Sequence, residues 1–316
     1  MIKNFLAALF AVASLAAGSA AAQPTTSPTL GNIKAAKAIH VAYPADSLPF
    51  SVNGPNGAPV GYSIDLCKRV IAQIGRAVGE PELKVNWIPG SVAERLQMVA
   101  SGRAELECAN TTQTQSRLAN VDFSNLIFVD GGGLLVVAGA PINQVSDLAG
   151  KRVAVLKGTT TEQRLNDMLR VRLINATVVP IADANQGVAM LESGAADAYA
   201  GDKVKLVGLA VQSKDPSKLA LVAEELSFEP YALAMPRNDS AFRLEVNKAL
   251  TQVYVGGDIE RIFGQWLGKL GRPSPLLAAA AALWSEDSHV AAMRERLRAR
   301  FDLADRHLRG YPGYVR

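Results

Sequence analysis

The chain has 316 residues, 49% of them apolar, with 33 basic and 29 acidic side chains and a formal charge of +4. This length favours two domains of ordinary size, and so small a net charge argues against a nucleic-acid-binding protein. The three histidines, His40, His289 and His307, lack metal-ligand spacing among themselves or with the cysteines. We therefore expect no metal site and no cofactor.

The amino terminus has the pattern of a secretory signal peptide. Lys3 precedes an apolar run over residues 5–17, and the small residues Ala20-Ala21-Ala22 follow, which predicts cleavage near Ala22. The run is shorter than the roughly 18 residues of a membrane span, and no cysteine follows it as a lipid-attachment site. We expect a free protein of the periplasm, with a flexible leader rich in Pro, Thr and Ser over residues 23–37.

The next part of the chain alternates between strand and helix patterns. A strand over residues 39–43 precedes a helix that ends near Gly79, because apolar residues recur at helical spacing up to that glycine. A strand over residues 83–88 follows, and Ser91 and Glu94 have the spacing of a capping box that opens another helix.

The second half repeats this order. Strands are predicted over residues 152–156, 178–181 and 196–201, and helices are predicted to open at Thr160 and Asp183. Alternation of strand and helix indicates an α/β fold with mostly parallel sheets, here in two lobes.

Two apolar, extended segments, residues 128–137 and 228–235, are candidates for crossover strands that form a hinge between the lobes. With both as crossovers, the C-terminal helices return to the first lobe. The predicted division is lobe 1 over 38–130 plus 231–272, lobe 2 over 131–230, and a C-terminal helical extension over 273–316.

The C-terminal extension has an amphipathic pattern. Arginines surround an apolar stripe at helical spacing, formed by Val290, Met293, Leu297, Phe301 and Leu308. We expect this stripe to pack against the protein's own lobe, and a surface for a partner is the alternative.

Cys67 and Cys108 are the only cysteines of the chain. An oxidising compartment permits one disulfide between them, but spacing does not show whether their Cα atoms lie close enough. A disulfide and two buried thiols both remain open.

Candidate binding residues cluster at predicted helix starts. A helix amino terminus offers unpaired N–H groups and a positive dipole end, which favour a carboxylate. Asn110 follows a predicted strand, Thr112 and Gln115 have capping-box spacing, and Arg117 lies in the next turn. An arginine pairs with both carboxylate oxygens at once, although a capped helix with a surface arginine explains the same pattern.

The second half offers a complementary pair. Thr160 lies at a helix start after Gly158, and Asp202 ends a strand and starts a helix. Each residue is consistent with simple capping, but Asp202 is also suited to bind an ammonium group. One lobe then supplies a cation and the other an anion, which is what a zwitterionic α-amino acid needs.

These residues resemble the extracellular solute-binding proteins of polar amino-acid importers, over roughly residues 38–270. The likeness rests on several motifs in the same order: Leu48-Pro49-Phe50, Val60-Gly61-Tyr62-Ser63-Ile64-Asp65-Leu66, Glu107-Cys108-Ala109-Asn110-Thr111-Thr112 running on to Arg117, Asp122-Phe123-Ser124, Gly158-Thr159-Thr160, and Leu191-Glu192-Ser193-Gly194 with Asp202. The glutamate/aspartate-binding branch looks nearest, through Glu107-Cys108, Thr111-Thr112 and Ile127-Phe128-Val129.

The resemblance implies a two-lobed fold with a two-strand hinge and a role for each candidate. The ligand's α-carboxylate would be held by Asn110, Thr112, Arg117 and Thr160. Asp202 would hold the α-amino group, and Arg95 stands where the acidic-ligand branch has an arginine that contacts the distal carboxylate.

Two departures from that branch weaken the expected preference for acidic ligands. Pro44 replaces a second arginine and Ala184 replaces a histidine, which leaves Arg95 as the distal cation. An unmatched carboxylate is costly in a desolvated cleft. We therefore expect weaker discrimination between acidic and neutral polar amino acids than in the resembling branch.

The predicted protein is not an enzyme. We expect a monomeric component that presents a small amino acid to the membrane subunits of an ABC-type importer. A dehydratase on the same fold is the alternative, for which Asp202 is the only strong candidate acid. A receptor domain that reports the ligand to a membrane sensor is the third hypothesis.

Overall fold

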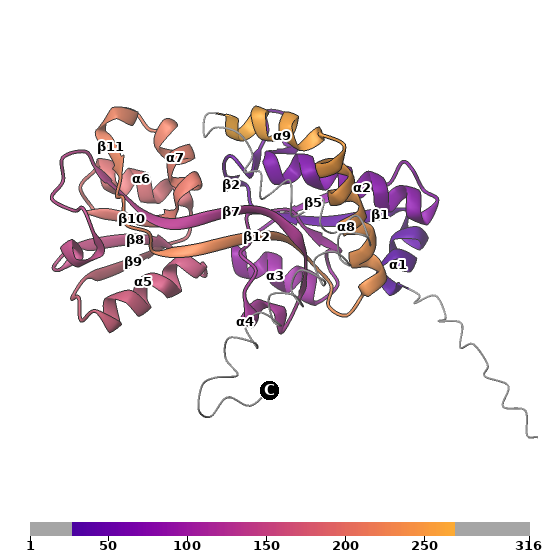
Figure 1. Cartoon of the computed structure of the whole chain (residues 1–316), viewed down its shortest axis with the longest axis horizontal. Helices are drawn as coiled ribbons and strands as arrows, with labels where there is room; N and C mark the ends of the chain where they lie inside the picture. Colours follow the sequence, from indigo (N-terminus) through magenta and orange to yellow (C-terminus); the bar gives the residue numbers. More distant parts are fainter. Residues whose placement is uncertain (1–26, 269–316) are drawn as a thin grey trace, which may run out of the picture.

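The computed structural model describes residues 27–268, which form two α/β lobes joined by two long neighbouring strands (Figure 1). One strand path runs through both lobes in the order β5-β1-β6-β12-β7-β10-β8-β9, and β11 pairs with β7. The predicted two-lobed α/β architecture is thereby confirmed.

The first lobe is built around a parallel set, in which β1 pairs with β5 and β6. A small antiparallel sheet, β2-β3-β4, lies in the same lobe. The strands of this lobe are β1 (Ala38–Tyr43), β2 (Asp46–Ser47), β3 (Ser51–Asn53), β4 (Pro59–Val60), β5 (Lys84–Pro89) and β6 (Leu106–Glu107). Its helices are α1 (Pro28–Ala36), α2 (Tyr62–Val78), α3 (Val92–Ala100), α4 (Gln115–Leu118), α8 (Ser240–Val255) and α9 (Asp258–Leu267).

The second lobe has β8 between β9 and β10, all parallel, and β10 pairs antiparallel with β7. Its strands are β8 (Arg152–Leu156), β9 (Thr177–Ile181), β10 (Ala198–Asp202) and β11 (Leu219–Leu221). Its α-helices are α5 (Thr160–Val171), α6 (Ala184–Glu192) and α7 (Lys203–Val211), and short 3₁₀ turns cover Val145–Leu148 and Pro216–Lys218.

The hinge consists of β7 (Asp122–Val137) and β12 (Ser227–Met235), which pair antiparallel and contain the two predicted crossover segments in full. Figure 1 shows both strands running from one lobe into the other. Phe128 and Tyr231 stack at this pairing, with ring centroids 6.2 Å apart. The predicted lobe boundaries, 130/131 and 230/231, fall inside these strands.

The two lobes have separate cores. In the first lobe α2, α8 and α9 bury apolar side chains together, and the last two helices return there as predicted. Helix α2 begins after Gly61, which has a φ of 142°. A Cβ atom at this position would lie 2.2 Å from the carbonyl oxygen of Phe50, so that only glycine fits here.

The prediction of a flexible leader over residues 23–37 is wrong for its second part. Residues 28–36 form α1, and Ile33 is fully buried in the core. The Ser27 hydroxyl caps this helix by accepting a hydrogen bond from the Leu30 amide, and Pro28 occupies the first helical position. Ser-Pro is a helix-start signal that the polar composition of the segment obscured.

The disulfide that the sequence left open is formed. Cys67 in α2 and Cys108 after β6 are bonded, with their Cα atoms 6.2 Å apart and both side chains buried. The bond joins a helix to the segment that carries Asn110 and Thr112.

Two predictions fall on residues outside 27–268: the signal peptide over 1–22 and the helical extension over 273–316 with its apolar stripe. Within the described range, no helix combines the length and the apolar character that crossing a membrane requires.

Candidate functional site

A cavity of about 250 Å³ lies between the two lobes. Its size is below the roughly 300–1,000 Å³ of sites for drug-sized ligands, as expected for a smaller molecule. Every site residue predicted from the sequence lines it: Arg95, Asn110, Thr112, Arg117, Thr160 and Asp202. The structure thus brings together residues from both lobes.

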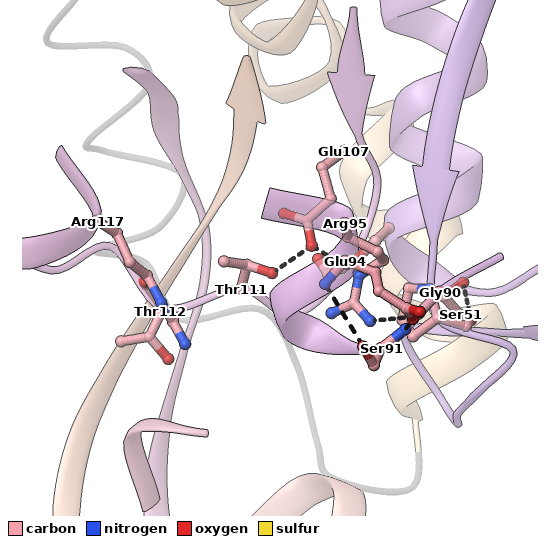
Figure 2. Close-up of polar contacts among 12 residues, drawn as sticks. Ser51, Gly90, Ser91, Glu94, Arg95, Glu107, Thr111, Thr112 and Arg117 are labelled. Atoms are coloured by element: carbon pink, nitrogen blue, oxygen red, sulfur yellow. Dashed lines mark hydrogen bonds and ion pairs between the residues drawn. The ribbon is translucent and has the colours of Figure 1, made fainter. Parts of the chain in front are cut away.

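Arg117 lines the cavity from the first lobe. Its Nη1 donates to the Thr112 carbonyl oxygen at 2.8 Å, and Figure 2 shows the guanidinium beside Thr112. Burial lowers the pKa of Arg117, while the carboxylates of Glu107 and Glu229 act in the opposite direction. Arginine nevertheless stays protonated in proteins, so a partly buried cation faces the cavity.

Neither Thr112 nor Thr160 is the helix cap that its spacing predicted. Thr114 caps α4 and Thr159 caps α5, each through its side-chain oxygen. Thr112 instead bridges to Tyr231 in β12. Each segment contains several threonines, and every one of them is suited to cap a helix. Only the tertiary contacts decide which threonine takes the N-cap position.

A buried carboxylate, Glu229, explains the position of these two threonines. It lies in β12 with 1% of its surface exposed, and it accepts hydrogen bonds from Thr112 Oγ1 and, at 2.8 Å, from Thr160 Oγ1. The two hydroxyl oxygens are 3.3 Å apart across the lobes. Sequence reasoning missed Glu229, because a single acidic residue in an extended apolar segment has no local signature.

Asp202 lines the cavity from the second lobe. It occupies the N-cap position of α7 but makes no capping hydrogen bond. Its Oδ2 accepts from Asn110 Nδ2 of the other lobe at 2.9 Å, and Oδ1 accepts from Thr161 Oγ1 at 3.0 Å. Burial, followed by the charge of Glu229, raises the pKa of Asp202. A ligand ammonium at this carboxylate would offset both effects.

Arg95 is buried and already paired. Its Nε donates to Glu107 Oε1 at 2.8 Å and its Nη1 to the Gly90 carbonyl oxygen at 2.7 Å. Glu107 also accepts from the Thr111 hydroxyl at 2.7 Å, and Figure 2 shows this cluster. Glu107 therefore compensates the charge of Arg95, which the sequence-based reasoning counted as an unpaired distal cation.

The cavity contains a cation that sequence reasoning missed. Lys205, in the first turn of α7, lines the cavity and is 7% exposed. It follows Asp202 by three residues, so that helical spacing from this predicted site residue could have pointed to Lys205. The conclusion that Arg95 alone remains as a distal cation is therefore wrong.

The lobes touch around the cavity. Asp46 Oδ2 of the first lobe accepts from the Ala184 amide of the second at 3.1 Å, in addition to the Asn110–Asp202 bond. Pro44 lines the cavity next to Asp46. The two positions that depart from the acidic-ligand branch, Pro44 and Ala184, thus lie at or beside the cavity.

Across residues 27–268 there is no group of three or more His, Cys, Asp and Glu side chains that could hold a metal ion.

A small cavity between two hinged lobes, with a cation and a carboxylate from opposite lobes, is the arrangement of a two-lobed solute-binding protein. Residues 39–269 match the model of the bacterial extracellular solute-binding proteins, family 3. The chain belongs to this family.

Relatives and structures agree with that assignment. The L-glutamate/L-aspartate-binding protein of Pseudomonas aeruginosa is 34% identical over 239 residues, which cover 75% of this chain and 79% of the relative. An ancestral arginine-binding protein bound to glutamine has a TM-score of 0.66 and 28% identity, covering 73% of this chain and 98% of its own.

A further neighbour bears on the enzyme alternative. The ancestral amino-acid-binding protein described as a precursor of cyclohexadienyl dehydratase has a TM-score of 0.65 and 26% identity, covering 76% of this chain and 99% of its own.

Proposed function

We propose that this protein is the periplasmic substrate-binding component of an ABC-type importer and that it captures a polar or acidic amino acid between its lobes. The observation that carries the proposal is the pair formed by Arg117 and Asp202, which line one cavity from opposite lobes. An α-amino acid presents a carboxylate and an ammonium group, and these two side chains complement both charges.

The lobe contacts support a mechanism in which closure and binding are coupled. Asn110, Thr112 and Arg117 belong to one lobe, whereas Thr160 and Asp202 belong to the other. A ligand that contacts both sets stabilises the closed arrangement by its differential affinity for that state. The closed lobes then present the surface that the importer's membrane subunits recognise.

We infer a binding role without catalysis, because the carboxylates near the cavity are already engaged. Asp202, Glu107 and Glu229 each accept hydrogen bonds from neighbouring side chains. A dehydratase needs an acid that is free to transfer a proton to the substrate. The second candidate function is a dehydratase, because one structural neighbour is described as the precursor of a dehydratase.

A thermal-shift screen of the common amino acids and small dicarboxylates tests the proposal. A ligand at 100 times its Kd should stabilise the protein by about 2.7 kcal/mol. If no compound of either class shifts the melting curve, the proposed function is wrong. Chromatography of the same mixtures, including prephenate-like acids, should return each compound unchanged, and product formation that requires Asp202 would favour the dehydratase.

A further inference from the structure

Among the buried charged side chains that line the cavity, Lys205 is distinguished by having no partner within the described residues, whereas Lys157, which also lacks one, is exposed. Lys205 is 7% exposed, lines the cavity and makes no hydrogen bond or ion pair with any residue of the described chain. By contrast, buried Arg95 is paired with Glu107, and Asp202 accepts from Asn110 and Thr161. A lysine held out of water without a counter-ion is unfavourable, which calls for a reason for its position.

Local structure supplies no such reason. Lys205 lies in the first turn of α7, at the positive end of the helix dipole, where a cation is disfavoured. One amide of this first turn, that of Val204, donates to Asp130. Neither capping nor the dipole explains a lysine at this place.

The nearby carboxylates do not form an ion pair with it. Burial lowers the pKa of Lys205, and the charges of Asp46, Asp202 and Asp183 act in the opposite direction. Asp46 accepts from the Ala184 amide, and Asp183 accepts from the Asn185 amide as the cap of α6. Each carboxylate is thus positioned by a donor of the protein, and Lys205 remains available to a group inside the cavity.

A charge comparison then indicates the ligand. In the proposed function the α-carboxylate is matched by Arg117 and the α-ammonium by Asp202, while Arg95 is compensated by Glu107. Lys205 is left over as a buried cation. We propose, resting on the function proposed above, that Lys205 binds a second carboxylate of the ligand, so that the cavity selects amino acids with an acidic side chain. Lys205 would take the place of the cations that Pro44 and Ala184 do not supply.

Calorimetric titration of the purified protein with L-glutamate, L-glutamine, L-aspartate and L-asparagine tests this inference. We expect the wild type to bind at least one acid more than tenfold more tightly than its own amide. Lys205→Met should weaken binding of that acid by tenfold or more and binding of the amide by less than threefold. Lys205→Arg should retain more of the preference than Lys205→Met.

Lys214→Met is the matched control, because Lys214 is 91% exposed and lies in the same lobe beyond the end of α7. It removes the same charge and should leave both affinities unchanged. Melting curves of all variants show whether the fold is retained.

Three outcomes would overturn the inference. The first is that the wild type binds amides or neutral amino acids as tightly as acids. This result needs no variant, and it does not contradict the proposed function. The second is equal loss of acid and amide in folded Lys205→Met, which indicates a structural role. The third is no binding of any amino acid, which removes the proposed function and this inference together.

Discussion

Arg117 is the side chain on which binding should depend most. Its guanidinium faces the cavity, half-buried, and is held by the Thr112 carbonyl oxygen. Removing one member of a buried charge-assisted pair costs about 2–5 kcal/mol. We expect Arg117→Ala to weaken amino-acid binding by about a hundredfold or more, and Arg117→Lys to be impaired as well, because an ammonium does not reproduce two parallel bonds.

The control for this experiment is Arg103→Ala, at an exposed arginine outside the cavity lining. It should bind as the wild type does in the same calorimeter. Near-normal affinity of folded Arg117→Ala would eliminate the assigned role.

Residue identity alone did not determine what the other arginine does. Arg95 lines the cavity as the resemblance implied, yet its Nε is bonded to Glu107, twelve residues later in the chain. The two side chains come from α3 and β6, and their meeting depends on how those elements pack. The charge available to a ligand is therefore a property of the folded cluster and not of one position.

At the scale of elements, the hinge strand β7 contains a carboxyl group that resists ionisation. Asp130 accepts from the Gly131 and Val204 amides and from the Tyr231 hydroxyl, so it links both hinge strands to the start of α7. Burial, followed by the charge of Asp202, raises the pKa of Asp130 to about 7. The ordinary pKa of an aspartate side chain is 3.8.

This shift predicts how stability depends on pH. Between about pH 4 and 7 the folded protein keeps a proton on Asp130 that the unfolded chain has lost, so the free energy of unfolding falls as pH rises. Asp130→Asn removes this contribution. The free energy of unfolding of the variant should therefore fall less steeply with pH over this range than that of the wild type. The two slopes should differ by up to about 1.4 kcal/mol per pH unit.

Urea unfolding without ligand at pH 5, 6 and 7 measures the two slopes. Asp167→Asn, at an exposed aspartate of α5, serves as the control and should follow the wild type. Parallel pH profiles for wild type and Asp130→Asn would contradict the prediction.

Element boundaries also show what local patterns determine. The capping box at Ser91 and the helix start at Asp183 were predicted and are present, since each depends only on residues within one turn. The caps of α4 and α5 were misplaced by two residues and by one, because several threonines compete in each segment.

At the scale of the whole molecule, two strands connect lobes that contact each other through polar bonds around the cavity and through α7, where partly buried Val204 packs against the core of the first lobe. Asp46 with Ala184 and Asn110 with Asp202 join the lobes around the cavity. Such an arrangement permits hinge opening without disruption of either core. We expect saturating ligand to reduce the radius of gyration measured by small-angle scattering.

Arg117→Ala, titrated with the same ligand concentration, should show no such compaction. Closure would be excluded as the binding motion if the wild-type scattering curves with and without a tightly bound ligand superimpose.

The sequence by itself determined the alternation of strands and helices after α1, the two hinge segments and six of the residues that line the cavity, but not Lys205. These follow from periodicity, caps and motifs, which act over short stretches of chain. Only the tertiary structure decided that Cys67 bonds to Cys108, that Glu107 compensates Arg95 and that Lys205 is an unpaired cation in the cavity. The physical reason is that burial and charge pairing depend on distances between elements, and no local pattern encodes those distances.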